Sequence, residues 1–157
     1  MAYLTGRTEV FTGDTTVVDS AAMHPVGTRA FDKDGNEYIY LLGVASVAIG
    51  TWVSFDEAGV TTRSAANAKG RVGVAMAAIV ASSYGWFQIY GEASGLALTA
   101  FADNGLVFLT GTAGSVDDTA VAGDLVVGAM GRSAVNETTL LATFELNYPF
   151  VTDNLGS

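Results

Sequence analysis

Apolar and polar residues alternate in short segments along most of this chain, and glycine-containing turns separate the segments. A period of two is typical of strands that bury one face, whereas a period near 3.6 would indicate helices. β-branched and aromatic residues, which favour strands, are common in these segments. The predicted strands span residues 28–31, 37–41, 52–55, 60–63, 70–80, 84–91, 92–100, 106–110, 125–129 and 141–146.

Turn residues predict how some of these strands are connected. Asp34-Gly35 indicates a hairpin between the strands on either side of it, because glycine accepts the positive φ of a tight turn. Asn104-Gly105 indicates a second hairpin, which would pair the strands at 92–100 and 106–110. Asp56 begins a further turn that leads into the strand at 60–63.

Many short strands with frequent turns predict an all-β fold, either a barrel or a sandwich. We expect one compact β-rich domain over residues 27–150 and a C-terminal tail over 151–157. Residues 1–26 differ, because their apolar residues are isolated or paired without a clear period. They predict either an extended N-terminal arm, with a short strand over residues 8–11, or a disordered terminus.

Composition excludes several classes of function. The chain has 16 acidic and 7 basic residues, a net charge of −9, and no two basic residues adjoin. Because nucleic-acid binding needs clustered Lys and Arg, neither DNA nor RNA is expected as a partner. The longest apolar run, residues 72–81, is about half the length of a membrane-spanning helix, so no membrane partner is expected.

Two further counts bear on stability and association. The chain has no cysteine, which excludes disulfides and thiolate metal sites. Charged residues make up only 15% of it, below the usual quarter. We therefore expect part of its surface to be covered by other subunits or by a partner.

Candidate catalytic residues are few. His24 is the only histidine, so multi-histidine metal sites are excluded and a Ser–His–Asp triad would have to use it. The pairs Asp56-Glu57 and Asp117-Asp118 lie in predicted turns, where carboxylates are usually solvated. A hydrolase with two carboxylates in one cleft stays an alternative, but no catalytic residue, cofactor or metal site is predicted.

The segment 84–91 is unusually aromatic. In a strand, Tyr84, Trp86, Gln88 and Tyr90 would share one face, and Phe87 and Ile89 the other. The favoured interpretation is that both faces are packed, one of them as a second packed surface. The alternative is an open aromatic platform for a carbohydrate or a base.

Several segments, taken together and in order, resemble those of a known protein family. GRVGVAMAA at 70–78 is followed by YGWFQIYG at 84–91, and HPVGT at 24–28, WVSFD at 52–56, GRSA at 131–134 and FEL at 144–146 surround them. In this order the segments resemble head decoration (cement) proteins of tailed phages over residues 24–150. They are strand and turn signatures rather than catalytic fingerprints.

This resemblance implies a structural protein made in the host cytoplasm that binds the major capsid protein on the outer surface of the virion. It further implies a β-tulip-like domain that forms a homotrimer, with an arm that orders on docking, and no catalytic residue or cofactor. An alternative is another virion module, such as a head fibre or tail component, with carbohydrate-binding aromatics.

Candidate interface residues lie in the two terminal segments. Extended backbone in the arm could add a strand to an exposed sheet edge, and apolar side chains would supply further contacts. Near the end of the chain, the alternative is that the segment folds back on the core. The candidates are Tyr3, Leu4, Val10 and Phe11 in the arm, and Tyr148 and Phe150 near the end of the chain.

Overall fold

The computed structural model describes residues 13–44 and 47–152. Within these residues the protein is built of strands and contains no helix, which confirms the all-β prediction. The strands are β1 (Arg29–Phe31), β2 (Glu37–Leu42), β3 (Trp52–Phe55), β4 (Thr61–Arg63), β5 (Gly70–Ala75), β6 (Tyr84–Leu96), β7 (Leu106–Leu109), β8 (Val116–Asp117), β9 (Leu125–Gly131) and β10 (Leu141–Val151).

All these strands belong to one antiparallel sheet in the order β1-β2-β6-β5-β10-β9-β7-β8, with β3 and β4 continuing from β5. The sheet bends back on itself twice. A single parallel bridge joins Leu42 at the end of β2 to Val60 beside β4, and another joins Ala97 after β6 to Val116 in β8. The curled sheet is therefore sandwich-like, and its ladders do not close into a barrel.

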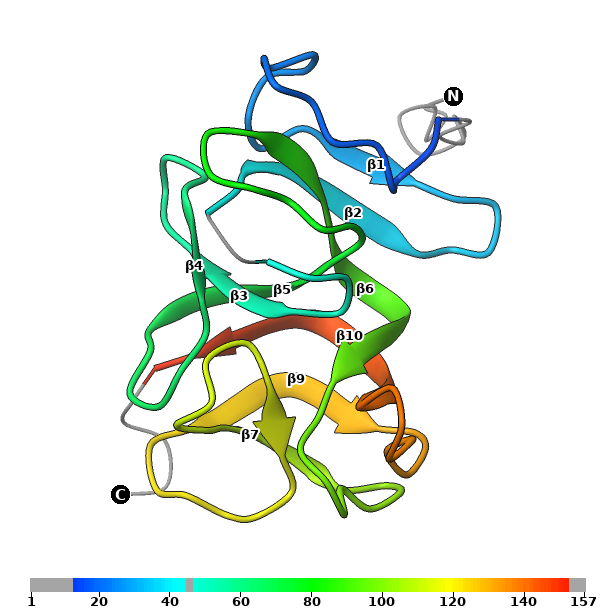
Figure 1. The fold of residues 1–157 in the computed structure, drawn as a ribbon, viewed down its shortest axis with the longest axis vertical. Helices are drawn as coiled ribbons and strands as arrows, with labels where there is room; N and C mark the ends of the chain where they lie inside the picture. Colours follow the sequence, from blue (N-terminus) through cyan, green and yellow to red (C-terminus); the bar gives the residue numbers. More distant parts are fainter. Residues whose placement is uncertain (1–12, 45–46, 153–157) are drawn as a thin grey trace, which may run out of the picture.

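The long strand β6 belongs to both curls (Figure 1). Its first half, Tyr84–Tyr90, pairs with β2, and its second half, Tyr90–Leu96, pairs with β10. Gly91 lies between the halves with φ of 93°, a backbone conformation that few side chains tolerate. The strand thus changes partner and direction at one glycine.

Each curl encloses apolar side chains. The upper core in the view of Figure 1 contains Ile39, Leu41, Val47, Val53, Ala75, Ala77, Ile79, Phe87 and Ile89. The lower core is larger and is organised around Trp52, Phe101 and Phe144. Phe144 lies edge-on to Trp52, with ring centroids 4.9 Å apart, and 5.2 Å from Phe101.

The predicted hairpin at Asp34-Gly35 is confirmed. β1 and β2 pair in register from Phe31–Glu37 to Arg29–Ile39. The Asp32 carboxylate accepts hydrogen bonds from the backbone N–H groups of Asp34 and Asn36, both at 2.9 Å, and so holds the turn. The same arrangement recurs at Asp56, which accepts from the backbone N–H of Ala58 and of Val60.

The second predicted hairpin is wrong. Asn104 does lie in a turn, with φ of 59°, but the strands beside it do not pair with each other. The end of β6 pairs with β10, while β7 pairs with β8 and β9. The segment after β6 instead crosses the end of the lower core and buries Phe101 there, so the turn connects two different parts of the sheet.

The strand predicted over 70–80 is shorter than expected. β5 ends at Ala75, and the alternation of buried residues reverses after it. Val72 and Val74 face the lower core as predicted, but Ala78 is exposed and Ile79 is fully buried in the upper core. β5 pairs with β3 and with β6, and these pairings end by Ala75. After Ala75 the chain turns and covers the upper core.

Residues 17–24 of the predicted arm lie against β2 and β6. Asp19 and Tyr84 exchange two backbone hydrogen bonds, at 2.9 and 2.8 Å. The Tyr40 hydroxyl donates to the Asp19 carboxylate at 2.6 Å, and the His24 ring lies 5.4 Å from the ring of Trp86. Trp86 is only 3% exposed, so the aromatic face of β6 is a packed surface rather than an open platform.

Candidate binding surface

The structure places two of the six predicted interface residues. Tyr148 and Phe150 lie at the end of β10, where its pairing with β9 shifts register between Leu146 and Phe150. Tyr148 has φ of 47°, so the irregularity is centred on it. Tyr3, Leu4, Val10 and Phe11 lie outside the described residues, and their role stays a prediction.

The register shift gives the two side chains different environments. Tyr148 is half-buried and packs against the upper core, and its hydroxyl donates to the Glu37 carboxylate. Its ring lies 5.3 Å from that of Tyr90, and the guanidinium of Arg29 lies 5.8 Å from its centroid. Phe150 has no such enclosure and is 39% exposed.

Glu37 fixes this arrangement. Its side chain is 1% exposed, and a carboxylate in such a site must be paired or hydrogen-bonded. Arg29 in β1 donates to it at 3.1 Å, and Tyr148 donates from the other end of the chain. Tyr148 is therefore held in one orientation by residues of β1 and β2.

Strand pairing sets Phe150 beside a cation. Arg71 in β5 is directly opposite Phe150 in β10 on one side and Phe55 in β3 on the other. Val127 in β9 continues the row beyond Phe150. Directly opposed residues of antiparallel strands project to the same face of the sheet, so this row presents one arginine between two phenylalanines.

Three hollows meet at the beginning of β5. We call the first the upper groove; it has a volume of about 480 Å³ and an apolar floor that includes Ile39, Leu41 and Phe55. The second, the lower groove, also measures about 480 Å³ and is lined by Lys69, Gly70, Arg71, Tyr148, Phe150, Val151 and Thr152. A third hollow of about 340 Å³ shares Lys69 and Gly70 with it.

Charge is unevenly placed around these hollows. The upper groove is lined by Arg29 and Arg71 and also by Asp56 and Glu57. The lower groove is lined by two cations, Lys69 and Arg71, and by no carboxylate of the described residues. Arg71 therefore has acids of the described residues beside it in the upper groove and none of them in the lower groove.

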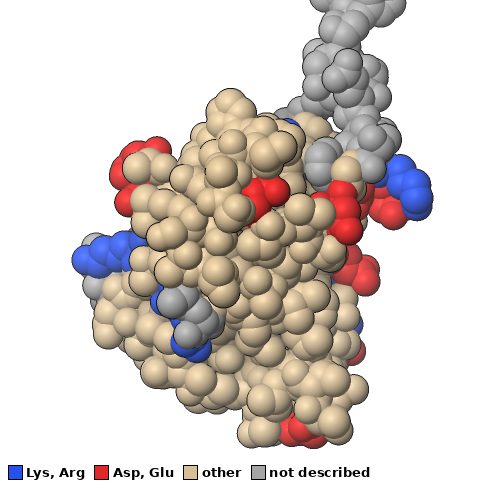
Figure 2. Space-filling view, turned by 45° about the horizontal axis from the view of Figure 1, so that its top comes forward, with Lys and Arg blue, Asp and Glu red and all other residues tan. Residues whose placement is uncertain are grey.

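Charged groups elsewhere are sparse. Figure 2 shows a face of the molecule on which acidic and basic side chains lie mainly near the edge and most of the centre is uncharged. On the outer side of β7 and β9, Leu106 and Met130 are opposite each other and are 52% and 37% exposed. Beside them Arg132 donates to Glu145 at 2.8 Å.

The arrangement suits the binding of another protein. Aromatic residues and arginine are enriched where protein interfaces gain most of their free energy, particularly when they border a concave apolar surface. Sequence reasoning identified Tyr148 and Phe150 but gave no role to Arg29, Lys69 or Arg71. Arg29 is far from Lys69 and Arg71 in the sequence, and only the pairing of the strands brings it to the groove that Arg71 also lines.

Residues 13–44 and 47–152 contain no group of three or more His, Asp or Glu side chains that could hold a metal ion. They also contain no helix long and apolar enough to cross a membrane.

Comparison of the chain with protein-family models, with curated proteins and with solved structures finds no match in any of the three.

Proposed function

We propose that this chain is a structural virion protein that binds the outer surface of a phage capsid and stabilises the head lattice. The observation that carries the proposal is the row of Phe55, Arg71 and Phe150 between two grooves, which is a surface of the composition used in protein interfaces. The resemblance of residues 24–150 to head decoration proteins gives the partner class, the major capsid protein.

We propose a binding role for the chain rather than a catalytic one, and we propose that it self-associates as a homotrimer. A low content of charged residues and exposed apolar side chains away from the grooves, such as Leu106 and Met130, supply a second surface for contacts between copies. Several weak contacts made by one trimer would add up to durable attachment.

The alternative of a carbohydrate-binding virion module has less support. It requires the aromatic row of β6 to be open to solvent, and Trp86 is 3% exposed beneath His24 and its neighbours.

The direct test uses heads of the phage that encodes the chain, prepared without this protein. We expect the purified full-length chain to co-sediment with these heads, to appear as added density on their outer surface by electron microscopy, and to raise the temperature at which they rupture. Native mass measurement of the free protein should give trimers. Heads that neither bind the chain nor gain stability would refute the proposal.

The predicted arm has its own test. A variant that lacks residues 1–12 retains all the strands and both cores of the described residues, so we expect it to fold. If the arm adds a strand to the capsid protein, this variant should bind undecorated heads at least tenfold more weakly than the full chain. Equal binding would show that Tyr3, Leu4, Val10 and Phe11 make no essential contact.

A further inference from the structure

We infer that the lower groove receives a carboxylate carried on an apolar segment of the capsid subunit, and that Arg71 is the residue that binds this carboxylate. The inference rests on the proposed function, because it names the surface and the partner chemistry of the same binding event. It goes beyond the arm and tail contacts expected from the sequence.

The first argument is the state of Arg71. Its side chain is exposed, and it forms no ion pair or hydrogen bond with any of residues 13–44 and 47–152. Three other cations of these residues, Arg29, Lys33 and Arg132, each pair with an acid. A guanidinium presents a planar set of donors that matches a carboxylate with two parallel hydrogen bonds.

The second argument is the direction from which an acid can approach. On the upper side of Arg71, Asp56 and Glu57 line the groove and would repel a carboxylate. On the lower side, Arg71 lines the groove and no acid of the described residues does. Arg71 can therefore meet a carboxylate in the lower groove without Asp56 and Glu57 beside it, although the chain as a whole is acidic.

The third argument is the apolar part of the same groove. Phe150 is 39% exposed and lies directly opposite Arg71, and Tyr148 and Val151 complete the wall. Glu37 holds Tyr148 in place, so little side-chain freedom is lost when a partner binds. If the partner carries an apolar side chain next to an acidic one, the apolar side chain would fill the groove while the acidic one reaches the guanidinium of Arg71.

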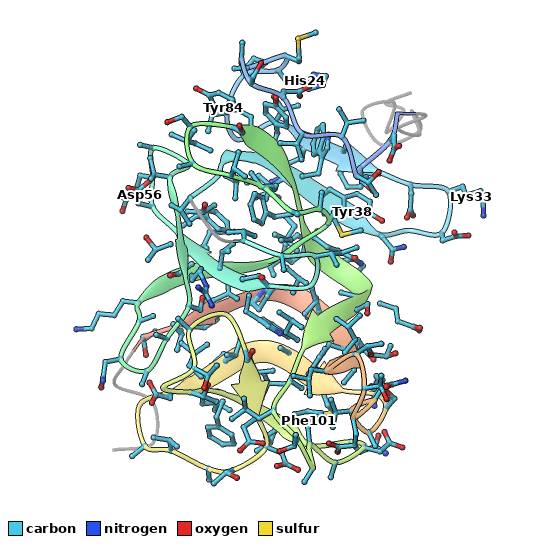
Figure 3. The ribbon with its side chains drawn as sticks, viewed as in Figure 1. His24, Lys33, Tyr38, Asp56, Tyr84 and Phe101 are labelled. Carbon is cyan, nitrogen blue, oxygen red and sulfur yellow. The ribbon has the colours of Figure 1, made fainter. Side chains whose placement is uncertain are left out.

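The charge of Arg71 can be changed while a distant cation serves as a matched control. Lys33 lies at the tip of the β1–β2 hairpin (Figure 3), where it forms an ion pair with the adjacent Asp34. We would compare Arg71→Gln, Arg71→Glu and Arg71→Lys with Lys33→Gln and Lys33→Glu. All variants should keep the melting temperature of the wild type, because both side chains are exposed.

The first measurement is binding to undecorated heads. We expect Arg71→Gln to bind at least tenfold more weakly, Arg71→Glu more weakly still, and Arg71→Lys in between, while both Lys33 variants bind like the wild type. Added salt should weaken the wild type more than Arg71→Gln. If the wild type binds and Arg71→Glu binds equally well, the inference is wrong and the proposed function stands.

The second measurement does not depend on the capsid. In an NMR titration with the peptide acetyl-Phe-Asp-Val-amide, we expect saturable shifts at residues 69–71 and 148–152 that the Asn analogue and the Arg71→Gln variant do not show. Absence of these shifts would overturn the inference, even if the wild type failed to bind heads and the proposed function had to be abandoned. If Arg71→Glu instead dissociates the free protein into smaller species, the groove binds a second copy, and the capsid subunit is not its occupant.

Discussion

Glu37 places a carboxylate in the interior, 1% exposed, at the point where the first and last strands of the chain meet. Arg29 in β1 and Tyr148 in β10 donate to it, so one side chain joins the first strand to the last. Arg29 keeps 40% of its side chain exposed, and water can solvate its cation if the carboxylate is removed. Loss of this contact would therefore cost free energy mainly because Glu37 or the Tyr148 hydroxyl would stay buried without a hydrogen-bond partner.

We expect Tyr148→Phe and Glu37→Gln each to lower the free energy of unfolding by about 1–3 kcal/mol, because each weakens a hydrogen bond to a buried charge. The double variant should lose less than the sum, since both single changes remove the same contact. Urea unfolding at pH 7 measures all three. Tyr90→Phe is the control, because Tyr90 is 41% exposed and loss of its hydroxyl should cost less than about 0.5 kcal/mol.

The Asp32 turn gives a pH-dependent prediction. Partial burial opposes ionisation of Asp32, but hydrogen bonds from Asn36, from Tyr38 and from two backbone N–H groups outweigh it and lower the pKa of this carboxyl. Stability that requires the carboxylate is then fully present above the unfolded-state value near 3.9 and is lost as pH falls through the lower folded-state pKa.

We therefore expect Asp32→Ala to cost about 1 kcal/mol of unfolding free energy at pH 7. This difference from the wild type should shrink as the pH is lowered below about 4, where the unfolded chain begins to take up the proton, and should be lost through the lower folded-state pKa. Thermal unfolding of both proteins between pH 2 and pH 7 measures it. A difference that stays constant over this range would show that the charge of Asp32 does not support the turn.

At the scale of elements, β6 depends on the bend at Gly91. A Cβ at this position would meet the side chain of Asn36 and would lie 3.1 Å from its Cα, in a backbone conformation with φ of 93°. Gly35 offers a comparison, because its φ is 86° and a Cβ there would meet nothing within 4 Å.

We expect Gly91→Ala to lower the free energy of unfolding by about 2–4 kcal/mol, from backbone strain and from overpacking together. Gly35→Ala should cost only about 1 kcal/mol, because strain acts alone there. Chemical denaturation of the two variants separates the contributions. Equal losses would mean that Asn36 moves aside and that the bend in β6 tolerates a side chain.

Local patterns predicted the elements whose structure is itself local. The turns at Asp34-Gly35 and at Asp56 are held by the carboxylates of Asp32 and Asp56, which accept hydrogen bonds from nearby backbone N–H groups, so the strands beside them were predicted correctly. Asn104-Gly105 also makes a turn, but whether the adjoining strands pair depends on β10, which lies some 40 residues later in the chain. No local pattern contains that information.

The same limit applies to the binding surface. Tyr148 and Phe150 were recognised because large apolar residues near a chain end are conspicuous in a sequence. Arg71 was part of a strand pattern, and nothing in that pattern indicated that its charge is unpaired. Its significance comes from its neighbours Phe55 and Phe150. β5 pairs with β3 on one side and with β10 on the other, and these two pairings place the phenylalanines beside Arg71.

At the scale of the whole molecule, two cores share the strands between them. β6 contributes Phe87 and Ile89 to the upper core and Ala93 to the lower core, so neither core is complete without it. Trp52 lies in the lower core, and Trp86 lies in the aromatic cluster beside the upper core. The two tryptophans can therefore report on the two halves separately.

We expect a single cooperative unfolding transition, because a shared strand cannot unfold in one half and stay intact in the other. Fluorescence of Trp86→Phe follows the lower core and that of Trp52→Phe follows the upper region. In each variant the fluorescence midpoint in urea should coincide with the midpoint from far-UV circular dichroism. Two separated midpoints within one variant would show that the halves fold independently.

The passage of β6 through both cores also limits how such a chain can be altered by recombination or protein engineering. A crossover after residue 91 would join the first half of β6 to a second half from another protein. The new half would have to match the first in register, twist and side-chain volume. Substitutions at the rim of the grooves carry no such constraint. We therefore expect that binding preference in this molecule can be redirected by a few point changes near β5, whereas exchange of whole segments would yield insoluble chimaeras.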